Sequence, residues 1–110
     1  MELAPDITPE DLKVFLEETE EQLQLLDEDI LKLERDGASD ALVQEIFRAA
    51  HTIKGSAATI GHSSMTDVGH AAETLLEKLR NGALSVSTAL INALLHSLDA
   101  LRAFKEQLAG

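Results

Sequence analysis

The sequence predicts an all-α protein that folds as an antiparallel, up-down-up-down bundle of four helices. Hydrophobic residues make up 45% of the 110 residues, enough for one core, and the good helix formers Ala and Leu dominate them. Apolar residues recur with helical spacing in four segments, and β-branched runs bounded by turns are absent. Because the connections between the segments are short, sequential helices should be antiparallel neighbours in a single domain, 1–110.

The first helix is expected at residues 9–36. Thr8 is a suitable N-cap, Pro9 suits the first helical position, and Gly37 ends the pattern. The acidic side chains of this segment, Asp29 among them, fall beside or opposite the apolar stripe and are expected on a solvated face. The apolar stripe consists of Leu12, Phe15, Leu16, Leu23, Leu26, Ile30 and Leu33, with Thr19 filling one gap.

The second helix is expected at residues 40–60. Ser39 or Asp40 opens it, and Gly61 is a typical C-terminal residue. Its apolar stripe is formed by Leu42, Val43, Ile46, Phe47, Ala50, Ile53, Ala57 and Ile60.

The third and fourth helices are expected at residues 64–81 and 86–109. A sequence that resembles a capping box begins at Ser64, and Ser85 or Ser87 opens the last helix. The third stripe includes Met65, Val68, Ala72, Leu75, Leu76 and Leu79, and the fourth Leu90, Leu94, Leu98, Leu101, Phe104 and Leu108.

The charge balance excludes some classes of partner. A net charge of -11 argues against a nucleic-acid backbone and against an anionic membrane, because both require a basic face. The chain contains no cysteine, no apolar run that could be inserted into a membrane and no apolar signal sequence at its N-terminus. The simplest expectation is a cytoplasmic protein.

The second helix carries one unusual stretch, "RAAHTIKGSAA". At about 100° per residue, His51 lies roughly 125° from the centre of the apolar stripe and should face solvent. Lys54 lies beside it, and the small residues Gly55 and Ala58 leave the helix backbone next to the imidazole uncovered. An imidazole, an ammonium group and a low surface should therefore share one outward face.

The third helix offers a possible partner for this histidine. His70 and Glu73 are three residues apart and lie off the apolar stripe. If the two helices are antiparallel neighbours, a carboxylate could accept a hydrogen bond from His51, fix its tautomer and leave the far nitrogen as a nucleophile. Lys54 could neutralise incoming oxyanions. The plainer interpretation, a surface histidine beside a solubilising lysine, remains open on spacing alone.

The other two histidines are expected to be ordinary surface residues. His62 follows a glycine in a predicted loop, and His96 lies off the apolar stripe of the fourth helix.

The run "AAHTIKGSAA" resembles the phosphorylation-site signature of histidine phosphotransfer (HPt) domains: a histidine, a lysine three residues later and an adjacent glycine. The longer run "EIFRAAHTIKGSAATIG" resembles more narrowly the N-terminal phosphotransfer domain of CheA-type chemotaxis histidine kinases. In that group a second histidine and a glutamate complete a hydrogen-bonded network, and His70 and Glu73 occupy the matching places. The resemblance covers roughly residues 8–108.

The resemblance implies a phosphoryl carrier in two-component signalling. His51 would be phosphorylated by a separate ATP-binding kinase domain and would pass the group to an aspartate of a response-regulator receiver, with Gly55 and Ala58 on the partner surface. The chain has no glycine-rich nucleotide loop and no obvious magnesium motif. We therefore expect no cofactor on this domain and no kinase activity of its own, with ATP and magnesium used by the partner domains.

Three alternatives remain at this stage. The chain could be the generic phosphotransfer domain of a multistep hybrid-kinase phosphorelay, which shares the motif of His51, Lys54 and Gly55. It could be a non-catalytic helical docking module. A metal-binding bundle is less well supported, because such sites need several inward-facing Glu-x-x-His motifs, whereas this chain has one outward-facing His-x-x-Glu.

Overall fold

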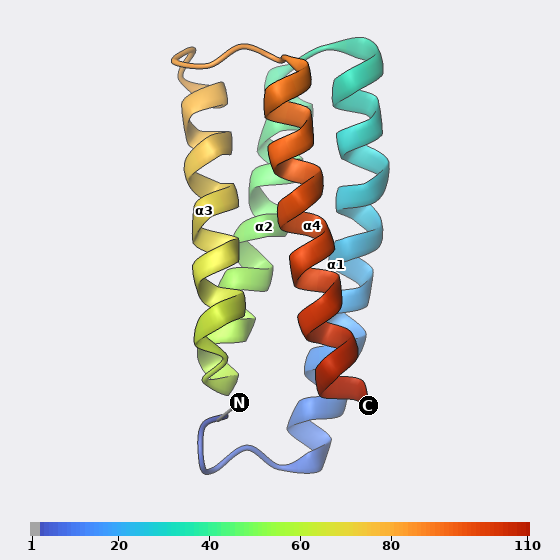
Figure 1. Ribbon diagram of the computed structural model, residues 1–110, viewed down its shortest axis with the longest axis vertical. Coiled ribbons are helices and arrows are strands. Elements are labelled where there is room, and N and C mark those ends of the chain that lie inside the picture. Colours follow the sequence, from blue (N-terminus) through green and yellow to red (C-terminus); the bar gives the residue numbers. More distant parts are fainter. Residues whose placement is uncertain (1–2) are drawn as a thin grey trace.

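The computed structural model describes residues 3–110, and these form four helices aligned along one long axis (Figure 1). They are α1 (Pro9–Asp36), α2 (Asp40–Ile60), α3 (Ser63–Arg80) and α4 (Thr88–Ala109). Each helix packs against the next, and α4 packs back against α1, so the bundle is closed and measures 41 × 21 × 21 Å. The described part of the chain contains no strand. The predicted all-α, up-down-up-down fold is confirmed.

Side-chain caps explain where three of the helices begin. The hydroxyls of Thr8, Ser39 and Ser87 each accept a hydrogen bond from a backbone N–H of the first turn, and Thr8 forms a complete capping box with Asp11. Gly61 ends α2 in the left-handed conformation, with φ of 82°. A side chain there would also collide with the segment before α1, because its Cβ would lie 2.6 Å from the nitrogen of Ala4.

Three helix boundaries differ from the prediction, one of them the end of α3, which lies at Arg80 instead of residue 81. α3 begins at Ser63, and its N-cap is His62, whose Nδ1 accepts the N–H of Met65 at 3.1 Å; Ser64 does not cap the helix. The expected start of the last helix at residue 86 was also too early, because Ser87 is the cap and the first helical residue is Thr88.

The core is almost entirely aliphatic and runs the length of the bundle. Three polar residues are nevertheless buried within it: Thr19, Asp29 and His62. The expectations that Asp29 lies on a solvated face and that His62 is a surface residue were therefore wrong. The apolar core consists of Phe15, Leu23, Leu26, Ile30, Leu33, Val43, Ile46, Ala49, Ala50, Ile53, Ala57, Ile60, Met65, Ala72, Leu76, Leu79, Leu90, Ile91, Leu94, Leu98 and Leu101.

Across residues 3–110, no helix combines the length and the apolar character needed to cross a membrane.

Candidate functional site

His51 lies near the middle of α2 with its imidazole outside the bundle. Its side chain is 62% exposed, as its angle from the apolar stripe predicts. The backbone one turn further along is bare: Gly55 and Ala58 are exposed, and a Cβ added to Gly55 would meet nothing within 4 Å. Gly55 is therefore not needed for packing within the chain, and the surface next to the imidazole is open to a large partner.

A single carboxylate from α3 connects the imidazole to the ammonium group. His51 Nδ1 lies 3.0 Å from Oε2 of Glu73, and Lys54 Nζ lies 2.9 Å from the same oxygen and 3.1 Å from Oε1. Glu73 is only 13% exposed, and Lys54 24%. Lys54 is thus less exposed than expected, because it lies against α3, where its ammonium group forms an ion pair with Glu73.

The charge on Glu73 determines which nitrogen of His51 is free. Burial alone would raise the pKa of Glu73, but the hydrogen bonds from Lys54 and His51 outweigh it and lower the pKa below its ordinary value. An ionised carboxylate can only accept hydrogen bonds, so Nδ1 carries the proton and donates it. In the neutral ring, the lone pair of the nucleophilic nitrogen is then on Nε2.

The position of Lys54 depends on a glycine that the sequence reasoning did not single out. Gly69 is buried in α3, and a Cβ at this position would lie 2.9 Å from Cβ of Lys54. The two helices therefore approach too closely here for any side chain. One turn later on the same helix, Glu73 meets Lys54. A glycine inside a predicted helix is the signal that could have indicated this contact, since it costs about 1 kcal/mol against alanine.

The remaining histidines are not part of this hydrogen-bonded cluster, although His70 lines the same surface hollow as Glu73 and Phe47. His70 is exposed on α3, and among the described residues its imidazole makes no hydrogen bond to His51, Lys54 or Glu73. His96 is exposed on α4, as expected. The ring of His62 is enclosed and packs in a T-shaped arrangement with Phe104, with ring centroids 5.2 Å apart.

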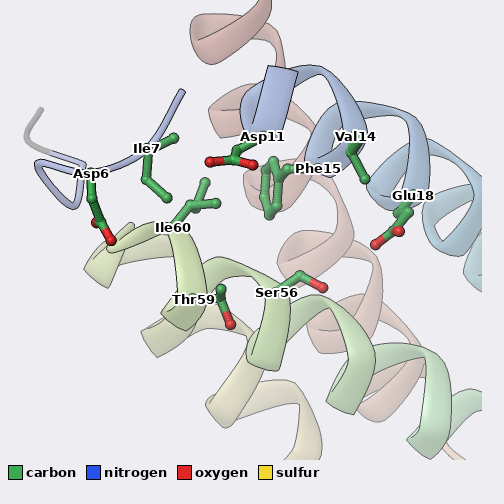
Figure 2. Close-up of a pocket in the computed structure, with 9 residues that line it drawn as sticks. All are labelled: Asp6, Ile7, Asp11, Val14, Phe15, Glu18, Ser56, Thr59 and Ile60. Atoms are coloured by element: carbon green, nitrogen blue, oxygen red, sulfur yellow. The ribbon is translucent and has the colours of Figure 1, made fainter. Parts of the chain in front are cut away.

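A groove lies beyond the bare part of α2, where it meets the start of α1. Its volume is about 430 Å³, and Figure 2 shows Phe15 and Ile60 close together between the two helices. The segment before α1 contributes to one wall. The lining residues are Asp6, Ile7, Asp11, Val14, Phe15, Glu18, Ser56, Thr59 and Ile60, an apolar patch with three carboxylates around it.

Nothing in residues 3–110 brings three or more His, Asp or Glu side chains together in a way that could hold a metal ion. The cluster around His51 itself presents an oriented imidazole with an ion pair beside it.

The sequence matches the family described as "Hpt domain" over residues 11–104. It is 43% identical over 99 residues to the chemotaxis protein CheA of Treponema pallidum, covering 90% of this chain and 12% of that protein. It is 41% identical over 90 residues to CheA of Bacillus subtilis, covering 82% of this chain and 13% of that protein. The chain thus spans about an eighth of the length of these curated relatives.

The bundle also resembles solved structures of phosphotransfer domains from CheA proteins. One is the CheA phosphotransferase domain from Thermotoga maritima, with a TM-score of 0.88 and 36% identity, covering 92% of this chain and 96% of that chain. Another is the phosphorylated P1 domain of CheA3 in complex with CheY6 from R. sphaeroides, with a TM-score of 0.85 and 26% identity, covering 93% and 80%.

Proposed function

The chain belongs to the Hpt domain family, and from this premise we propose that it carries a phosphoryl group on His51 in chemotaxis-type two-component signalling. A separate ATP-binding kinase domain supplies the group, and the receiver domain of a response regulator accepts it on an aspartate. One observation carries the proposal. The largely exposed imidazole has its Nδ1 occupied by Glu73, which leaves Nε2 as the free ring nitrogen.

Phosphoryl transfer to this atom needs no further acid or base from the chain. The lone pair of Nε2 attacks the γ-phosphorus of ATP, an N–P bond forms, the bond to the bridging oxygen breaks, and ADP leaves with that electron pair. The proton on Nδ1 stays in place, and the charge of Glu73 stabilises the positive charge that develops on the ring. In the second transfer a carboxylate oxygen of the receiver attacks phosphorus, and the electron pair of the N–P bond returns to Nε2.

Lys54 takes part as a positioning residue for Glu73. Its Nζ contacts both carboxylate oxygens, so it holds Glu73 ionised and in place. We propose no direct contact between His70 and the reacting imidazole, although the matching residue belongs to the hydrogen-bonded network in the group that the sequence resembles.

ATP and magnesium act on the partner domains in this proposal. Phosphoryl transfer depends mainly on positioning and on neutralisation of charge at the phosphates. The cluster on this chain orients the nucleophile but presents a single lysine, already paired with Glu73. ATP-dependent kinases and receivers of this kind would place the domain in the cytoplasm.

The two partners reach His51 over the bare part of α2, past Gly55 and Ala58. The groove lined by Phe15 and Ile60 lies further along on the side of α1 (Figure 2). Ser56 and Thr59, on its α2 wall, are about 8 and 12 Å along the helix from His51, well within the footprint of a docked domain. The acidic residues around the groove favour a partner that presents an apolar side chain flanked by Lys or Arg.

The test is a two-step transfer with purified domains. We expect a CheA-type ATP-binding domain and labelled ATP to give an acid-labile, base-stable label on this chain, which a receiver domain with magnesium then removes. The His51→Gln variant should take up no label while keeping its helical content. A docking module without phosphoryl chemistry would bind the same partners and remain unlabelled, which would refute the proposal.

A further inference from the structure

Phe47 lies one helical turn before His51, on the same face of α2. The two rings are nearly parallel, with an angle of 6° between their planes and centroids 6.3 Å apart. This separation is within the range of offset aromatic pairs. Phe47 is only partly buried, so a core position alone does not explain why its ring is aligned with the imidazole.

The ring of Phe47 is itself held by a residue from α3. The guanidinium carbon of Arg80 lies 4.5 Å from the ring centroid, a cation–π arrangement. Arg80 in turn donates to Oε1 of Gln44 on α2 at 3.1 Å, and it forms an ion pair with Glu77 on its own helix. Because the guanidinium is anchored at both helices, it limits the positions that the phenyl ring can take.

The contact between Arg80 and Gln44 lies a fixed number of residues from the contact between Glu73 and His51 on each helix. Glu73 reaches across to His51, and seven residues further along α3, Arg80 reaches Gln44, seven residues back along α2. Seven residues are about two turns of a helix, so both connections lie along the same seam between the antiparallel helices. The histidine is therefore connected to α3 directly, through Glu73, and indirectly, through Phe47 and Arg80.

We propose that Phe47 is a positioning residue for His51 and that Arg80 holds Phe47 in the required orientation. This inference rests on the proposed function. The bond from Nδ1 to Glu73 is a single restraint on an exposed side chain with two rotatable bonds, so it leaves the ring some freedom to turn. The parallel face of Phe47 removes this freedom, so that Nε2 points along one direction toward the incoming phosphorus.

The test separates orientation of the ring from docking of a partner. Phosphoramidate is a small phosphoryl donor that requires no protein contacts, so its rate reports on the imidazole alone. We expect Phe47→Leu, which keeps an apolar side chain but removes the aromatic face, to slow labelling by phosphoramidate and by the kinase domain equally, about three- to tenfold. Phe47→Tyr should restore most of the rate, and Arg80→Gln should give a smaller loss.

The matched control is Arg48→Gln, which removes an exposed positive charge next to Phe47 in the sequence. It should label at the wild-type rate with both donors. A Phe47→Leu variant that labels normally with phosphoramidate would overturn the inference. Slowing only with the kinase domain would also overturn it, because Phe47 would then contact the partner instead of orienting the ring.

NMR of the unphosphorylated protein gives an independent readout. In the wild type, the Hδ2 and Hε1 signals of His51 should carry the ring-current shift of Phe47 and report one ring orientation. The Arg80→Gln variant should lose this shift and show averaging between orientations, and an unchanged spectrum would contradict the proposed restraint. If the wild type shows the restraint but takes up no phosphoryl group from any donor, the proposed function fails while the orientation of the ring is upheld.

Discussion

At the scale of single residues, the ionised carboxylate of Glu73 decides the chemistry of His51. It holds the proton on Nδ1 and leaves Nε2 exposed, while Lys54 keeps the carboxylate charged. In the proposed function, the nucleophile is thus prepared by two side chains that need not touch the phosphoryl group. Catalytic histidines in buried triads are oriented by a carboxylate in the same way.

Glu73→Gln is the first prediction at this scale. The amide lacks the negative charge that fixes the proton on Nδ1, so both tautomers of His51 should be populated. Labelling by phosphoramidate should slow about tenfold or more, though less than the roughly 10⁴-fold seen when the orienting carboxylate of a buried triad is replaced, because this site is more exposed. Nitrogen chemical shifts of the ring report the tautomer ratio. Glu34→Gln, an exposed residue on α1, is the control; the same tautomer ratio in both variants would exclude an orienting role for Glu73.

The contact between His51 and Glu73 could be anticipated from the sequence, because each residue lies on the polar side of its own helix and the two helices follow one another. The burial of Asp29 and His62 could not. Helical periodicity gives the angle of a side chain on its own helix, but not how far a neighbouring element covers it. Asp29 is enclosed between helices, and His62 occupies a cap position that Ser, Thr, Asp or Asn more often fills.

At the scale of helices, the close approach of α2 and α3 assembles the site. The sequence predicted the bounds of α2 and came within one residue at each end of α3, since their apolar stripes and the Ser39 cap of α2 are strong local signals. The depth of their contact could not be predicted, because it depends on which small residue of one helix faces which side chain of the other. Gly69 against Lys54 is that contact.

Two glycine substitutions test whether the close approach of α2 and α3 assembles the site. Gly69→Ala should separate α2 from α3 or displace Lys54, and we expect it to lower the melting temperature and to slow labelling of His51. Gly55→Ala faces open space and should raise the stability of α2 by about 0.5–1 kcal/mol, with unchanged labelling by phosphoramidate. Thermal unfolding measures the stability of both variants, and phosphoramidate labelling measures the reactivity of His51 in each. If Gly69→Ala is as stable and as reactive as the wild type, the close approach has no role in the site.

At the scale of the whole molecule, the buried polar groups make stability depend on pH. Burial, aided by the nearby carboxylate of Glu45, raises the pKa of Asp29 to about 6. The folded protein therefore holds this proton more tightly than the unfolded chain does. Its stabilising contribution is complete below the unfolded pKa of about 3.9 and is lost as the pH rises through about 6. Burial lowers the pKa of His62, which has the opposite effect: stability falls as the pH drops below about 6.5.

Asp29→Asn isolates the first of these contributions. Asparagine resembles the protonated carboxyl group in shape and cannot ionise, so the variant should be more stable than the wild type by about 1–3 kcal/mol at pH 8 and similar to it near pH 4. Denaturant unfolding at several pH values measures the difference. Because His62 titrates in both proteins, subtraction removes its effect. A difference in stability that does not change with pH would show that Asp29 is not protonated on folding.

The shape and charge of the bundle also bear on its partners. Glu18 lines the groove between α1 and α2 (Figure 2) and is not part of the cluster around His51. Glu18→Lys should weaken binding of a receiver domain that presents basic residues and reduce the salt dependence of that binding, without changing labelling by phosphoramidate. Titration calorimetry at two ionic strengths tests this, with Glu28→Lys as a control outside the groove. Equal affinities for wild type and Glu18→Lys would place docking elsewhere.

The central claim is that Nε2 of His51 is the atom that accepts the phosphoryl group. It is tested most directly by phosphorylating the uniformly ¹⁵N-labelled protein and locating the N–P bond by NMR, from the phosphorus–nitrogen coupling and the shifts of the ring. We expect one phosphorylated histidine, His51, substituted at Nε2, with the proton on Nδ1 still shared with Glu73. A phosphoryl group on Nδ1, or on His62, His70 or His96, would contradict it.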